Sequence, residues 1–160
     1  MQKTKKVLFL CSGNSCRSIM AEGMLNHFGK DRFVAYSAGS FPTGTVHPMA
    51  VDTLNAKGIA ITGYRSKSWN EFSGKPIDIA ITLCNQAAGE ACPIFTGKPI
   101  KAHWDVPDPS QIQGSGRKAG FDAVYGILEP RIKALLRLPM EQMSREEISE
   151  KLRQIDTMAA

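Results

Sequence analysis

Four short apolar runs alternate with longer stretches in which apolar residues recur every three or four positions. The runs are Lys5–Leu10, Phe33–Ala38, Ile77–Leu83 and Ile100–Trp104. The first and third runs are apolar on both faces, which is typical of strands buried in a parallel sheet. The pattern therefore predicts four strands separated by helices.

The helical stretches carry apolar stripes and end signals. Gly29 suits the end of the first helix, and Pro48 suits the start of the second. Ser68 and Glu71 form a candidate capping box for a short turn. The stripes are Ile19, Met20, Met24, Leu25 and Phe28; Ala50, Val51 and Leu54; Phe121, Val124, Leu128, Ile132 and Leu135; and Ile148, Leu152 and Ile155.

Two features shape the C-terminal part. Pro130 interrupts the third stripe, but the stripe continues past it, so we expect a kink rather than a break. Ser144 and Glu147 form a second capping box at the start of a final helix, Ser144–Met158.

Strands that alternate with helices indicate an α/β fold, here a single doubly wound domain whose four-stranded parallel sheet is flanked by helices. Ligands of such folds lie beyond the carboxyl ends of the strands. Cys11 follows the first predicted strand, Cys84 follows the third, and Asp108 comes shortly after the fourth. The topology therefore brings these three residues to one rim of the sheet.

Composition narrows the function classes. The net charge of +5 comes from Lys and Arg scattered among acids, without a basic block, so nucleic acid is not the expected partner. No segment reaches the apolar length of a membrane span, and the start carries no cleavage-like pattern. We therefore expect a cytoplasmic protein without membrane contact.

The chain has four cysteines, Cys11, Cys16, Cys84 and Cys92. Without a secretory signal, catalytic or redox roles are favoured over structural disulfides. Their spacings do not resemble a zinc site, and no histidine is close enough to complete one. No metal and no cofactor is expected.

The segment from Cys11 to Ser18 joins the first strand to the first helix. A loop at a helix start points backbone N–H groups at one spot, where the helix dipole is positive, so it suits a tetrahedral oxyanion. A helix N-terminus and a guanidinium both favour a thiolate at Cys11, and Arg17 offers paired donors to two oxygens. The candidate oxyanion-binding residues are Ser12, Gly13, Asn14, Ser15, Cys16, Arg17 and Ser18.

Individual loop residues have expected roles. Gly13 permits a turn where a Cβ would clash, and the Asn14 side chain holds the shape of the loop. Ser15 and Ser18 donate to the Cys11 sulfur or cap the helix, and both roles are compatible.

Asp108 precedes Pro109 near the same rim. Its carboxyl group is a candidate general acid that protonates a departing oxygen. Turn formation by Asp-Pro is the alternative, and Asp105 is a weaker competitor for the catalytic role.

These motifs resemble a known family over roughly residues 5–137. The loop Cys11–Ser18, Glu22, Tyr36-Ser37-Ala38-Gly39 and Asp108-Pro109 resemble the low-molecular-weight protein tyrosine phosphatase fold. Thr82-Leu83-Cys84, Cys92-Pro93 and His103-Trp104 resemble the thioredoxin-coupled arsenate reductases built on that fold. Phosphatases and arsenate reductases share this loop, whereas a phosphatase does not need the pair Cys84 and Cys92.

The resemblance implies a relay of three thiols. Cys11 attacks arsenate while Asp108 protonates the leaving oxygen, Cys84 then attacks the Cys11 sulfur, and Cys92 attacks Cys84 to free Cys11. Thioredoxin or a glutaredoxin-type dithiol protein would reduce the final disulfide. Cys16 remains a supporting thiol.

Some relatives bind potassium beside the loop through residues that match Asn14, Glu22 and Ser37 together with an aspartate. Lys67 stands in the place of that aspartate, and its ammonium group can replace the cation. We therefore predict that this protein does not require potassium.

The resemblance places a phosphatase-like arsenate reductase domain at residues 1–140 and a helical extension packed on it at residues 141–160. Two rival functions stay open. One is a phosphatase that hydrolyses phosphomonoesters through Cys11, Arg17 and Asp108, and the other is a non-enzymatic oxyanion-binding or redox-sensing protein.

Overall fold

The computed structural model describes residues 4–61, 63–83, 98–109 and 114–156. Its centre is a four-stranded parallel sheet in the order β2-β1-β3-β4. The strands are β1 (Lys5–Cys11), β2 (Phe33–Gly39), β3 (Ile79–Thr82) and β4 (Ile100–His103). The predicted doubly wound α/β fold is thereby confirmed, and β1 continues one residue further than its apolar run, as far as Cys11.

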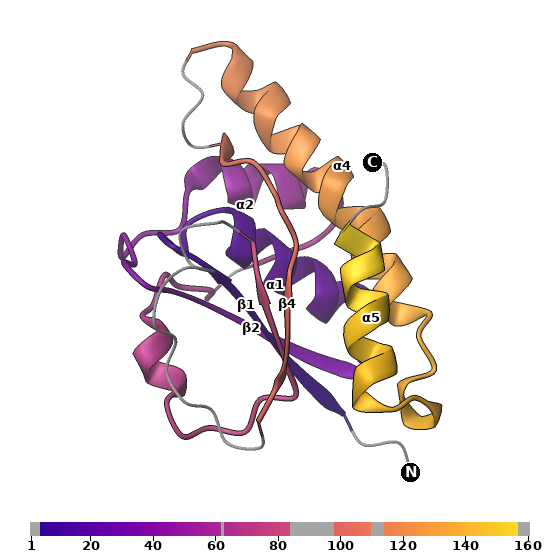
Figure 1. Ribbon diagram of the computed structural model, residues 1–160. Coiled ribbons are helices and arrows are strands. Elements are labelled where there is room, and N and C mark those ends of the chain that lie inside the picture. Colours follow the sequence, from indigo (N-terminus) through magenta and orange to yellow (C-terminus); the bar gives the residue numbers. More distant parts are fainter. Residues whose placement is uncertain (1–3, 62, 84–97, 110–113, 157–160) are drawn as a thin grey trace.

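Figure 1 shows the four α-helices gathered beside this sheet, and all four share one core with it. They are α1 (Arg17–Phe28), α2 (Pro48–Asn55), α4 (Gly116–Leu136) and α5 (Arg145–Asp156), with short 3₁₀ turns η1 (Trp69–Phe72) and η3 (Met140–Gln142). Alternate residues of β1 point to opposite faces of the sheet and pack in two separate cores. Val7 and Phe9 pack with the four helices, whereas Leu8 and Leu10 pack with η1.

The long helix α4 runs unbroken through Pro130. Leu128 and Ile132, on either side of the proline, are both completely buried. Packing of the apolar stripe therefore outweighs the backbone hydrogen bond that a proline removes.

The two predicted capping boxes have different outcomes. At the start of α5, the Ser144 N–H donates to Glu147 Oε1 at 2.9 Å and the Glu147 N–H donates to Ser144 Oγ at 3.1 Å, so this box is confirmed. At η1, Ser68 Oγ accepts from the Asn70 N–H, but the Glu71 carboxylate binds Arg65 instead. The second half of that prediction is wrong because a charged partner outside the turn competes for the carboxylate.

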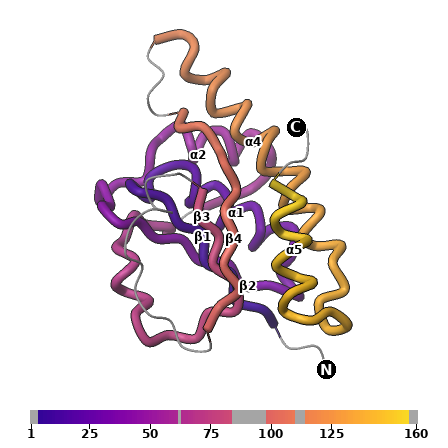
Figure 2. Tube along the Cα trace, in the orientation of Figure 1, coloured from indigo at the N-terminus to yellow at the C-terminus, as the bar shows by residue number. Residues whose placement is uncertain are grey.

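Helix α5 packs against β4 and α4 through Ile148, Leu152 and Ile155, all buried as the stripe predicts. Its C-terminal end lies beside the chain that leaves β4 (Figure 2). The buried indole Nε1 of Trp104 donates to the Leu152 carbonyl at 3.0 Å. The C-terminal segment is therefore joined to the sheet by both apolar and polar contacts.

No helix in the described part of the chain has the length and apolarity that crossing a bilayer requires.

Candidate active site

The strand order changes direction between β1 and β3, and the carboxyl end of β1 opens into the loop that precedes α1. A crevice at such a point is the usual ligand site of a doubly wound sheet. Cys11 is the last residue of β1 and Arg17 is the first residue of α1, so a short loop connects the strand to the helix.

The carbonyl groups of this loop face outward. Those of Ser12, Gly13 and Ser15 accept hydrogen bonds from the N–H groups of Phe41, Thr43 and His47, at 2.8 to 3.0 Å. Because the C=O and N–H of one peptide point in opposite directions, the N–H groups of residues 13, 14 and 16 turn to the inner side of the loop. This arrangement matches the anion-binding loop that the sequence predicts.

Asn14 holds the shape of the loop, as predicted. It is completely buried and adopts a left-handed backbone conformation with a φ of 46°. Its Nδ2 donates to Ser18 Oγ at 2.7 Å, and its Oδ1 accepts from the Lys67 N–H at 2.8 Å. A Cβ on Gly13 would lie 3.3 Å from the Thr43 methyl group. This contact is tight, in agreement with the expectation that a side chain at this position is unfavourable.

A second glycine lies under the loop. A Cβ on Gly39, at the end of β2, would collide with the Ser12 carbonyl oxygen and would lie 2.8 Å from that of Cys11. The loop therefore reaches its position only because β2 ends in a residue without a side chain.

Ser18 bridges Asn14 and Cys11. Its Oγ lies 2.9 Å from Cys11 Sγ, inside the protein. Since the Asn14 amide already donates to this oxygen, the Ser18 hydroxyl hydrogen is available to the sulfur, and a thiolate can only accept. Helix capping by Ser15 or Ser18 is not observed: Cys16 is the N-cap of α1 and no side chain caps it.

The Arg17 guanidinium is almost completely buried beside the loop. Its Nη1 donates to the Val106 carbonyl at 3.0 Å, and its Nη2 lies 3.5 Å from Asp108 Oδ2. Among the described residues, its buried Nε has no hydrogen-bond partner. A buried N–H that lacks an acceptor is costly, so an added acceptor at this position would stabilise the site.

Asp108 reaches the loop from the segment after β4, as its spacing predicts. Besides contacting Arg17, its Oδ1 lies 3.7 Å from Cys16 Sγ. Asp105 is exposed, and its backbone is hydrogen-bonded to α4 and α5. The structure thus brings Asp108, and not the competing Asp105, to the candidate site.

Two cysteines in one loop have different environments. Burial, with the Asp108 carboxylate and Cys11 adding to it, raises the pKa of the Cys16 thiol to about 11, while Arg17 acts in the opposite direction. Cys16 therefore stays protonated at neutral pH, which suits a supporting thiol rather than a nucleophile.

A buried charged pair lies beneath the loop. Lys67 Nζ is 3.9 Å from Glu22 Oε1, and Ser37 Oγ donates to the same oxygen at 2.5 Å. Burial raises the pKa of Glu22, against the effects of Ser37 and Lys67. Burial also lowers the pKa of Lys67, and Glu22 opposes that shift. Asn14, Glu22, Ser37 and Lys67, which the sequence groups together, are thus neighbours in space.

The candidate thiols Cys84 and Cys92 lie outside the described residues. The last described residue before Cys84 is Leu83, whose N–H donates to the Leu10 carbonyl at 2.7 Å. Among the described residues, no cluster of three or more His, Cys, Asp or Glu side chains is arranged to hold a metal ion.

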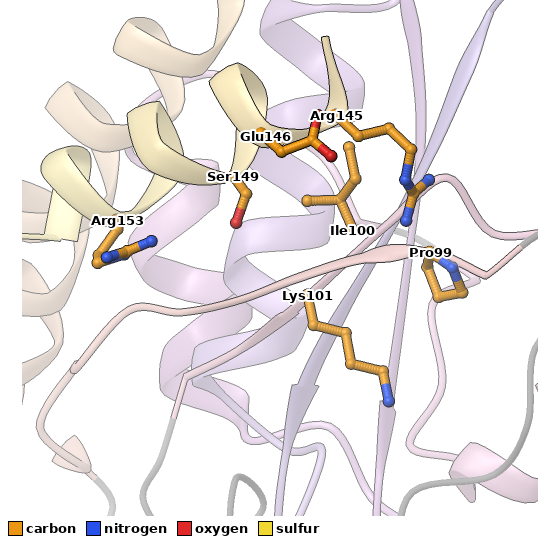
Figure 3. Close-up of a pocket in the computed structure, with 7 residues that line it drawn as sticks. All are labelled: Pro99, Ile100, Lys101, Arg145, Glu146, Ser149 and Arg153. Carbon is orange, nitrogen blue, oxygen red and sulfur yellow. The ribbon is translucent and has the colours of Figure 1, made fainter.

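A hollow of about 470 Å³ lies elsewhere, between β4 and α5. Figure 3 shows Lys101 pointing away from the α5 side chains that line it. Arg145 donates to the Lys98 carbonyl, and Arg153 pairs with Glu150. The basic groups of this hollow therefore do not converge on one point as those of an oxyanion site would.

The sequence patterns do not predict a role for two residues near the site, Arg131 and Asp156. Arg131 and Asp156 bind the backbone of Asp105, three residues before Asp108. One local signal marks Asp156: an acid in the last turn of a helix faces the negative end of the helix dipole, so it requires a tertiary partner.

Alkylation of Cys16 is expected to begin only in strongly alkaline solution, because a pKa of about 11 leaves little thiolate below that range. Asp108→Asn should shift its labelling curve to lower pH, since the lost negative charge disfavours the thiolate; Asp108→Glu is the charge-matched control. Mass mapping of iodoacetamide-treated, reduced protein across a pH series measures this. Full labelling of Cys16 at about pH 8 in the wild type, or an unmoved curve in Asp108→Asn, would contradict the assignment.

Lys67→Ala is expected to lower the free energy of unfolding by about 2 kcal/mol at neutral pH, because it leaves the Glu22 carboxylate buried without its cation. A carboxyl group whose pKa is raised in the folded state stabilises that state when protonated. The deficit of the variant should therefore shrink as the pH falls toward the range in which Glu22 gains its proton. Urea unfolding at several pH values tests this, with exposed Lys30→Ala as control; a deficit independent of pH would refute it.

A family model described as low molecular weight phosphotyrosine protein phosphatase matches residues 6–153, and so includes most of α5. Arsenate reductase of Shouchella clausii is 38% identical over 133 residues, 81% of this chain and 94% of that protein. Arsenate reductase 1 of Staphylococcus epidermidis is 40% identical over 133 residues, 81% of this chain and 96% of that protein.

A solved structure described as an arsenate reductase in the phosphate binding state superposes with a TM-score of 0.68 at 30% identity, and covers 83% of this chain and 97% of its own. The chain therefore belongs to the low-molecular-weight phosphotyrosine protein phosphatase family, and these close relatives within it are arsenate reductases.

Proposed function

We propose that this protein reduces arsenate to arsenite with Cys11 as the first nucleophile, and so serves in arsenic detoxification. The observation that carries the proposal is the buried Arg17 at the end of the loop that Cys11 begins, because its Nε lacks a partner within the described structure. Relatives named arsenate reductase support it, and one similar solved structure is in a phosphate-binding state. Phosphate and arsenate are both tetrahedral oxyanions, and the same inward N–H groups would bind either.

In the first step, the Cys11 thiolate attacks arsenic, an As–S bond forms and one arsenate oxygen leaves as water. Arg17 binds two of the remaining oxygens, and Asp108 supplies the proton to the leaving oxygen. The contact of Asp108 with Arg17 supports this role, because it holds the carboxyl group beside the oxyanion site.

Reduction requires a second thiol. Cys84 attacks the Cys11 sulfur, the As–S bond breaks, and its electron pair stays on arsenic, so arsenite leaves and a Cys11–Cys84 disulfide remains. Cys92 then attacks Cys84, which releases the Cys11 thiolate and leaves a Cys84–Cys92 disulfide. The hydrogen bond between Leu83 and Leu10 supports the first exchange, because the residues preceding Cys84 and Cys11 are neighbours.

A dithiol protein, thioredoxin or a glutaredoxin-type protein, would return two electrons to the Cys84–Cys92 disulfide, as suits a cytoplasmic enzyme. Without Cys84 and Cys92, the same loop with Arg17 and Asp108 would hydrolyse a phosphomonoester through a phosphocysteine. The match to a phosphatase family model favours this as the second candidate function.

Cys84→Ser and Cys92→Ser are each expected to reduce arsenate-dependent NADPH oxidation, coupled through thioredoxin and its reductase, by more than about 100-fold, because each removes a thiol from the relay. Ala88→Ser, which adds the same side chain between them, is the matched control. Cys92→Ser should still release one arsenite per protein and trap a Cys11–Cys84 disulfide, visible by mass mapping.

Turnover that survives either cysteine change would refute the relay. Hydrolysis of p-nitrophenyl phosphate that depends on Cys11, in a protein inactive on arsenate, would favour the phosphatase. Tight sulfate binding without either activity would favour an oxyanion-binding protein.

Turnover is also expected to be equal in potassium chloride and choline chloride of the same ionic strength. The Lys67 ammonium group already provides positive charge beside Glu22, so no dissolved cation is needed there. Activation by potassium, beyond any effect of ionic strength, would contradict this expectation.

A further inference from the structure

We propose that Asp156 and Arg131 are positioning residues through which helix α5 sets the place of Asp108. The inference rests on the proposed function, in which Asp108 donates a proton. Neither residue touches the oxyanion loop; both act through the backbone of Asp105.

Asp156 holds one side of that backbone. Its Oδ1 accepts from the Asp105 N–H at 2.7 Å. A carboxylate at the C-terminal end of a helix opposes the helix dipole, a local cost that this tertiary contact and the neighbouring arginine offset. The Leu152 carbonyl, one turn earlier, accepts from Trp104 Nε1. The end of α5 is therefore fixed to two consecutive residues of the chain leaving β4.

Arg131 of α4 holds the other side. Its side chain is buried, and Nη1 donates to the Asp105 carbonyl at 3.1 Å and lies 3.4 Å from Asp156 Oδ1. Its Nη2 donates to the Asp156 backbone carbonyl at 3.1 Å. Both backbone polar groups of Asp105 are thus bound, one by each member of an ion pair whose arginine is buried and whose aspartate is half-buried.

From Asp105 the chain passes to Asp108 with little freedom. Pro107 has a fixed φ, and the Val106 carbonyl binds Arg17. A shift at Asp105 would therefore be carried along the chain to Asp108, since only three residues separate them. The backbone of the oxyanion loop has its own anchors in residues 41–47, so its inward N–H groups would keep their places and arsenate binding would change less than the rate of proton transfer.

The test mixes fully reduced protein with arsenate, in the absence of any reductant, and follows the loss of free thiols at several arsenate concentrations. Asp156→Ala is expected to lower the maximal rate about tenfold while the half-saturating arsenate concentration changes less than about twofold. Asp156→Asn keeps an acceptor for the Asp105 N–H and should recover most of the rate. Glu150→Ala, on the exposed face of α5, is the matched control.

The deciding measurement is the double variant. If Asp156 acts through Asp108, Asp156→Ala should have no further effect on the residual rate of Asp108→Asn. The inference would be overturned if Asp156→Ala left the maximal rate unchanged. It would also be overturned if Asp156→Ala lowered the rate of Asp108→Asn by the same factor as it lowers that of the wild type. Wild-type protein that loses no thiols to arsenate would refute the proposed function itself and the inference with it.

Discussion

A buried guanidinium needs acceptors on several sides, and Arg17 finds them in parts of the chain that are far apart in sequence. It begins helix α1, yet it binds the Val106 carbonyl and Asp108, about 90 residues later. Burial makes each of these contacts strong and makes an unpaired N–H costly. Arg17 Nε has no hydrogen-bond partner within the described structure, and it is the donor that we propose an oxyanion would engage.

Burial and close neighbours also distinguish the two cysteines of the loop. Cys16 is next to Asp108 and has its pKa raised to about 11, whereas Cys11 lies at the strand end and contacts the Ser18 hydroxyl. Burial, and after it the Asp108 carboxylate, raise the pKa of Cys16, whereas the Ser18 hydroxyl can donate to Cys11, so identical side chains five positions apart have different surroundings. Beneath them, Lys67 and Glu22 compensate each other's charge, while Lys67 and Asn14 are joined through the backbone. Polar contacts join this loop to residues 41–47 and to Lys67, in addition to the packing of its two cysteines in the core.

Local sequence signals predict well where no competitor is present. The strands follow the apolar runs closely, although β3 (Ile79–Thr82) is shorter than its run, and the capping box of Ser144 and Glu147 forms as expected. The same motif at Ser68 and Glu71 is incomplete because Arg65 captures the carboxylate. A short-range pattern is therefore a reliable guide only when its charged member has no stronger partner nearby.

The sequence by itself determined the sheet, its helices and the loop from Cys11 to Ser18, because periodicity, glycine positions and a cysteine–arginine spacing are local properties of the chain. It also placed Asp108 at the rim, since the ends of parallel strands meet there. Only the tertiary structure decided that Asp108, and not Asp105, faces the loop, and that Arg131 and Asp156 bind the backbone between sheet and site. Such pairings join segments that are distant in the sequence. Local sequence around a charged residue does not show which distant residue it contacts once the chain has folded.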